Sequence, residues 1–141
     1  MGKIGPSGKG GIMGVIGGYH HVHIVSPDPE AVARWLGEFL GGEVTGREEP
    51  RGARNVIVRI GEAALSIRTP RPSDKIIETE GARPFGLDHI CFLVDDLKAM
   101  VERMRAGGVE IAEEIFAHSG GSDAAFVVGP ENVLFELIQK K

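Results

Sequence analysis

Three positions in this chain carry side chains that could together hold a metal ion. His21 and His89 lie 68 residues apart in similar surroundings, and Glu136 is the one carboxylate within the apolar run of residues 133–139. A charge inside such a run is costly unless it is paired or bound to a metal. Two neutral imidazoles and one carboxylate suit Fe(II), Mn(II), Co(II), Ni(II) or Zn(II) and leave positions open for a substrate. The sequence therefore predicts one divalent transition metal held by His21, His89 and Glu136.

The two histidines open the two copies of a weak internal repeat that begins after residue 18. Each copy starts with a short stretch rich in β-branched and aromatic residues, which is typical of a strand. An amphipathic helix follows, capped by Ser26 or Asp28 and stopped by Gly41 in the first copy, and stopped by Gly107 in the second. The expected strands span residues 18–25, 43–47, 55–60 and 63–68 in the first copy and 86–94, 110–116, 124–128 and 133–139 in the second.

This order of elements predicts an α+β fold built from two βαβββ modules. One such module leaves a sheet face uncovered, so two must pair to bury a common core. We expect a cupped, partly open mixed sheet, with module one over residues 19–70, a linker over 71–84 and module two over 85–139. Residues 1–18 are rich in glycine and are expected to be a disordered leader or an added tail.

Side-chain alternation along the strands places the candidate residues on the concave side. His21 and His23 share one face of the first strand, and His89 and Cys91 share the equivalent face in the second copy. His23 could therefore support a metal ligand, transfer a proton or act as an alternative ligand.

Composition excludes several classes of protein. The chain has 141 residues, a net charge of −4 and a pI near 5.7, which argues against a nucleic-acid surface. No apolar run approaches the roughly 20 residues needed to cross a bilayer, so no membrane partner is expected. Cys91 is the single cysteine and no secretory signal is evident, so we expect a cytoplasmic protein.

Residues 19–139 resemble the vicinal oxygen chelate superfamily, which includes glyoxalases, bleomycin-resistance proteins and extradiol dioxygenases. Members have paired βαβββ modules with ligands on the first and last strands of each module, and His21, His89 and Glu136 match three of these positions. Residues 35–42 are similar to the first helix of the family and its leucine-glycine ending. Among its branches, the second module looks most like methylmalonyl-CoA epimerase.

The sequence departs from the epimerase pattern at two places. The fourth ligand position falls at Ser66, where glyoxalase I has Glu and the epimerase has Gln. The position of the epimerase's glutamate base falls at Asn55 or Val56. Moving a proton from one face of a carbon to the other needs two bases. Glu136 could be one, and Glu48 could be the other, although Glu48 also fits a solvated turn.

Two further residues are candidates for substrate binding together with Ser66. Arg68 shares the face of Ser66, and its guanidinium could bind a carboxylate or phosphonate, or could lie free at the strand end. His118, in a glycine-rich loop, could supply an acid or base, or could be a surface histidine.

The resemblance leaves three functions open. The first is a metal-dependent isomerase or lyase of glyoxalase or epimerase type, in which the metal chelates two neighbouring substrate oxygens and stabilises an enolate-like intermediate. The second is a dioxygenase or a fosfomycin-resistance-type transferase with the same His-His-Glu set. The third is a non-catalytic drug-binding module. In each case the expected partner is a small molecule, and members of this size imply a homodimer.

Overall fold

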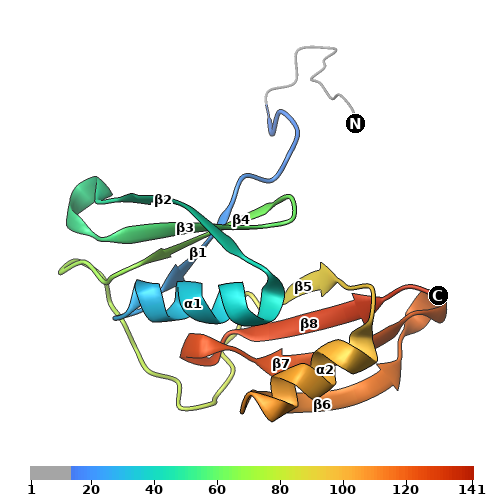
Figure 1. The fold of residues 1–141 in the computed structure, drawn as a ribbon. Coiled ribbons are helices and arrows are strands. Elements are labelled where there is room, and N and C mark those ends of the chain that lie inside the picture. Colours follow the sequence, from blue (N-terminus) through green and yellow to red (C-terminus); the bar gives the residue numbers. More distant parts are fainter. Residues whose placement is uncertain (1–13) are drawn as a thin grey trace.

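The computed structural model describes residues 14–141 and contains two modules of the same topology (Figure 1). Residues 1–13 of the expected leader lie outside the described residues. The first module consists of β1 (Val22–Val25), α1 (Pro29–Leu40), β2 (Glu43–Glu48), the 3-10 turn η2 (Pro50–Gly52), β3 (Asn55–Ile60) and β4 (Ala63–Arg68). The second consists of β5 (Ile90–Leu93), α2 (Leu97–Ala106), β6 (Glu110–Ala117), the turn η3 (Ser119–Gly121), β7 (Asp123–Val128), the turn η4 (Pro130–Asn132) and β8 (Leu134–Gln139).

Each module folds into one four-stranded mixed sheet. The strand orders are β1-β4-β3-β2 and β5-β8-β7-β6, so β1 and β5 are edge strands. Each edge strand runs parallel to its single neighbour, and the remaining pairs are antiparallel. The predicted α+β class and the order βαβββ are therefore confirmed, and the two sheets stay separate.

Local sequence signals set the helix boundaries. The Asp28 side chain accepts a hydrogen bond from the Ala31 amide at 3.1 Å, and Gly41 ends α1 in the left-handed conformation with φ 71°. Asp96 caps α2 in the same way through the Ala99 amide at 3.0 Å. Both helices end at the predicted glycines, and of the two predicted caps for α1 the structure uses Asp28.

The first strand of each module is shorter than predicted. The expected stretches 18–25 and 86–94 reduce to Val22–Val25 and Ile90–Leu93, so His21 and His89 each lie one residue before a strand. An edge strand can form hydrogen bonds to one neighbour only. Its registered pairs begin at Val22 with Leu65 and at Ile90 with Phe135.

The two modules share one hydrophobic core through their helices. Trp35 of α1 stacks on Phe135 of β8 with ring centroids 5.5 Å apart. Arg103 of α2 donates to the carbonyl oxygens of Glu38 and Phe39 at 2.7 and 2.9 Å, which satisfies two backbone groups at the end of α1. The opposite face of each sheet carries no helix, and we call it the helix-free face. Among residues 14–141, no helix is long and apolar enough to cross a membrane.

Candidate metal centre and substrate cavity

Glu136 lies in the middle of β8 on the helix-free face of the second module, and only 5% of it is exposed. The Nε2 atom of His89 lies 2.9 Å from one carboxylate oxygen. The Nε2 atom of His118, from the loop between β6 and β7, lies 3.4 Å from the other. Within residues 14–141, no lysine or arginine pairs with this carboxylate. The structure therefore surrounds a buried carboxylate with two imidazoles.

His89 lies between two carboxylates. Its Nδ1 atom is 2.8 Å from Asp88, while its Nε2 atom faces Glu136. Arg83 holds the other Asp88 oxygen at 3.0 Å, and hydrogen bonds first from His89 and then from Arg83 lower the pKa of Asp88. A neutral imidazole carries one ring proton only. One such proton can serve only one of the two carboxylates, so the other contact fits a further proton or a metal ion.

Cys91 is the neighbour of Glu136 across the β5–β8 pair. Burial first, and then the charge and hydrogen bond of Glu136, raise the pKa of the Cys91 thiol to about 11. Without a bound metal the thiol is therefore protonated at neutral pH, which makes it a poor nucleophile.

The first module carries a separate group of histidines beside β1. The Nδ1 atoms of His20 and His21 lie 2.7 Å apart, and the rings of His21 and His23 have centroids 4.8 Å apart. In the part of the chain that the structure describes, no three His, Cys, Asp or Glu side chains are arranged to hold one metal ion. The structure thus brings Glu136 together with His89 and His118, and leaves His21 beside His20 and His23.

A cavity of about 790 Å³ touches one histidine of each group. It is bounded by β1, by the linker and by the second module, and both His23 and His89 line it. Burial first, and then the charges of His21, Arg68 and Arg71, lower the pKa of His23, so this ring is mostly neutral at neutral pH. The volume is in the range of small-molecule sites.

The remaining candidates lie on the first module. Ser66 is 8% exposed and is the registered neighbour of His23. Arg68 binds Asp74 of the linker through both terminal nitrogens, at 2.7 and 3.3 Å, so it is paired within the chain. Glu48 is exposed near the end of β2, opposite Asn55. The roles proposed for these residues remain predictions.

Two functional candidates were not found by sequence reasoning. Asp88 precedes His89 directly, so a carboxylate next to a candidate ligand was the available signal. Asp74 lies in the irregular linker, where no pattern marks a partner for Arg68.

The fold, with two βαβββ modules around one core, defines an α+β protein of the glyoxalase-like class. The chain belongs to the Glyoxalase/Bleomycin resistance protein/Dioxygenase superfamily, whose sequence model matches residues 20–126. The family resemblance predicted from the sequence is therefore confirmed.

Comparison with individual proteins adds three relatives. The chain is 29% identical over 103 residues to the ethylmalonyl-CoA/methylmalonyl-CoA epimerase of Cereibacter sphaeroides, which covers 69% of this chain and 75% of the epimerase. A glyoxalase family protein from Enterococcus faecalis superposes with a TM-score of 0.69 at 22% identity, over 86% of this chain and 96% of that one. The fosfomycin resistance protein FosX from Listeria monocytogenes, in complex with Mn(II) and sulfate, gives a TM-score of 0.68 at 18% identity, over 90% and 95%. The two structures show a common fold.

Proposed function

We propose that this protein is a divalent-metal-dependent isomerase or lyase that acts on a small molecule with two neighbouring oxygen atoms. The observation that carries this proposal is the position of His89. Its ring lies between Asp88 at 2.8 Å and the buried Glu136 at 2.9 Å, which is the arrangement of a histidine ligand oriented by a carboxylate behind it. Glu136 has no Lys or Arg partner within residues 14–141, so a metal cation would supply the charge that its burial requires.

In this proposal His89 and Glu136 hold the ion from the second module, and His21 completes the set. Because His21 is not grouped with these two residues in the described chain, we assign it to the first module of a second copy. The exposed edges support this assignment, since β1 and β5 each end a sheet and Leu93 on β5 is 66% exposed. Members of this family often form dimers, so a homodimer is the expected assembly.

A divalent ion at this site would act as a Lewis acid on two substrate oxygens and lower the cost of removing a neighbouring proton. Glu136 and His118 lie within 3.4 Å of each other and could pass that proton between them. His23 is mostly neutral, so it can accept a proton, and in the two-copy site it would come from the same copy as His21. Glu48 is the proposed second base, and Ser66 is proposed to contact the substrate.

The first test is metal content of the purified full chain by inductively coupled plasma mass spectrometry. We expect about one transition metal per chain in the wild type. Glu136→Ala and His89→Ala should both lose it, while Glu114→Ala, which removes an exposed glutamate of the same module, should keep it. A wild type that is metal-free and cannot be reloaded would overturn the proposal and favour a drug-binding module. Metal-dependent oxygen uptake would instead favour the dioxygenase alternative.

The two-copy arrangement has its own test. His21→Ala and Glu136→Ala are each expected to be metal-free. When the two variants exchange subunits, each mixed dimer regains one intact site, so about a quarter of all sites should bind metal again. No recovery in a mixture shown to exchange subunits would contradict a site shared between copies.

A further inference from the structure

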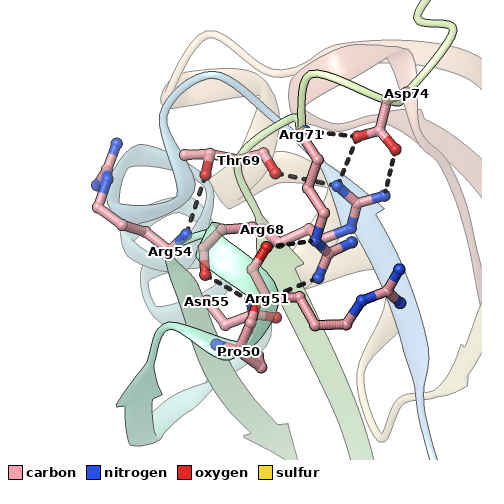
Figure 2. A network of polar contacts seen from close by, with 9 residues as sticks. Pro50, Arg51, Arg54, Asn55, Arg68, Thr69, Arg71 and Asp74 are labelled. Carbon is pink, nitrogen blue, oxygen red and sulfur yellow. Dashed lines mark hydrogen bonds and ion pairs between the residues drawn. The ribbon is translucent and has the colours of Figure 1, made fainter.

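Three arginines gather at the end of β4, outside the candidate metal centre. Arg51 comes from the turn η2, Arg68 from β4 and Arg71 from the start of the linker. Figure 2 shows their guanidinium groups on one side of the turn, whereas the guanidinium of Arg54 is directed away from them. The cluster therefore contains Arg51, Arg68 and Arg71, and we call it the arginine cluster.

Within residues 14–141, Asp74 is the one carboxylate that forms an ion pair with an arginine of this cluster. Asp74 accepts hydrogen bonds from both terminal nitrogens of Arg68. It also accepts one from the backbone amide of Arg71 at 2.7 Å. The Arg71 side chain donates to the carbonyl oxygens of Arg51 and Pro50 at 3.2 and 3.4 Å, which are neutral acceptors. Within residues 14–141, the guanidinium of Arg51 has no hydrogen-bond or ion-pair partner. Three cations and one anion leave two positive charges without a counter-ion.

Arg51 has a backbone conformation that is unusual for a residue with a long side chain. Its φ is 56°, in the left-handed region that favours glycine. The equivalent turn of the second module, η3, has Gly120 at this position with φ 72°. A long cationic side chain therefore stands where glycine would adopt the backbone conformation without strain. Glu131 has a similar φ of 58° in the turn η4, and its carboxylate accepts a hydrogen bond from Ser26, whereas the Arg51 guanidinium has no such partner within residues 14–141.

Arg68 of the arginine cluster lies on the helix-free face of the first module, as Ser66 and His23 do. Arg68 follows Ser66 by two residues on β4, so their Cα atoms are about 7 Å apart along the strand. Ser66 is in register with His23, and the charges of Arg68 and Arg71 reach that ring. In the proposed two-copy arrangement, the first module that supplies His21 also supplies the cluster, so an anion held there would lie on the same module face as Ser66 and His23.

We propose that Arg51, Arg68 and Arg71 bind a doubly charged phosphate-type group of the substrate. Guanidinium groups bind phosphate oxygens through paired charge-assisted hydrogen bonds. Asp74 neutralises one of the three charges, and the two remaining charges match a dianion. The assignment of this group to the substrate rests on the proposed function, whereas the anion site itself does not.

The test is calorimetric titration of the metal-free full chain with inorganic phosphate at pH 8 and low ionic strength. We expect Arg51→Gln to weaken phosphate binding about tenfold, because one charge-assisted contact is lost while the exposed turn is unaffected. The matched control is Arg105→Gln, whose arginine is paired with Glu114 on the second module, and it should bind phosphate as the wild type does. Asp74→Asn should bind phosphate several-fold more tightly, because the internal competitor for Arg68 loses its charge.

Equal phosphate affinity in the wild type, Arg51→Gln and Arg105→Gln would overturn the site, as would equal weakening in both variants. Acetate serves as the monoanionic probe, and binding as tight as that of phosphate would overturn the assignment to a dianion. These measurements need no bound metal. A failed metal test with phosphate binding intact would therefore reject the proposed function alone, and the reverse result would reject the anion site alone.

Discussion

The two modules have the same strand order and the same register in their parallel edge pairs, yet their helix-free faces differ in chemistry. His23 pairs with Ser66 between β1 and β4, and the equivalent pair between β5 and β8 is Cys91 with Glu136. The first module therefore offers an imidazole and a hydroxyl where the second offers a protonated thiol and a carboxylate. The same module topology occurs twice in the chain, with different polar side chains at equivalent positions.

The difference continues toward the ends of the strands. Arg68 is the registered neighbour of Val25, and the equivalent neighbour of Leu93 is the apolar Ile138. The turns also differ in charge, because η2 has the cationic Arg51 at its left-handed position and η3 has Gly120. Cations are thus concentrated on the first module and the buried carboxylate on the second. In the proposed function, a first module binds the charged part of the ligand and supplies one metal ligand, while a second module supplies the other two.

The two modules share one hydrophobic core, and a substitution in this core should have the largest effect on stability. Trp35 stacks on Phe135 of the other module and also contacts the tilted ring of Phe39 in its own helix. Trp35→Ala should lower the free energy of unfolding by about 3 to 5 kcal/mol, because it removes a large aromatic contact from a packed interface. Urea unfolding followed by circular dichroism measures this loss. One cooperative transition is expected, and two separate transitions would show that the modules are independent.

The second effect concerns metal affinity, which should depend strongly on the residue of the second module and weakly on its equivalent in the first. Glu136→Gln should weaken metal binding at least ~100-fold, beyond the upper range for residues that only support a ligand. Ser66→Ala, at the equivalent position of the first module, should change it less than about threefold, since a neutral hydroxyl is a weak ligand for these ions. Competition with a chromogenic chelator gives both constants. Similar losses in the two variants would mean that Ser66 is itself a ligand.

A smaller loss of metal affinity is expected at Asp88. Its hydrogen bond at 2.8 Å fixes the ring orientation of His89, so Asp88→Asn should weaken metal binding about 10- to 100-fold without removing a ligand. Asp95→Asn changes an exposed aspartate nearby and is the control. The spectrum of a bound Co(II) ion should keep its ligand pattern in Asp88→Asn. Unchanged affinity would exclude an orienting role for this carboxylate.

Local signals explain which features the sequence could predict. The caps Asp28 and Asp96 and the glycines after each helix act within a few residues, so the helix boundaries followed from composition and spacing. Glu136 was found because a charge in an apolar strand has few explanations. Its contact with His89 follows from the pairing of β5 with β8, which the repeat implies.

Features that depend on packing were not accessible from the sequence. The approach of His118 to Glu136 depends on the path of the loop between β6 and β7. The pairing of Arg68 with Asp74 depends on how the irregular linker folds back on β4. The separation of His21 from Glu136 depends on how the modules pack, and the internal repeat specifies each module but not their relative placement.

The fourth prediction exchanges the residues that distinguish the two turns. Arg51→Gly should raise the free energy of unfolding by up to about 1 kcal/mol, because glycine adopts positive φ without the side-chain clash. Gly120→Arg should lower it by about the same amount, since it places that clash in the second module. Urea unfolding of both variants measures these two changes in the free energy of unfolding. Destabilisation by Arg51→Gly would mean that Arg51 holds the turn together, which would weaken its assignment to anion binding.

The smallest effect is a dependence of stability on pH that belongs to the first module. The Arg68 guanidinium first, and then the Arg71 amide, lower the pKa of Asp74 from its ordinary 3.8 to about 2. A carboxyl group with a lowered pKa stabilises the folded state above its unfolded pKa, and this contribution disappears as the pH falls through the folded value. The difference in unfolding free energy between the wild type and Asp74→Asn should therefore be constant from pH 7 to about 5 and shrink below about pH 4. Asp95→Asn is the control without this ion pair, and a difference for Asp74→Asn that stays constant down to pH 3 would mean that its charge does not stabilise the first module.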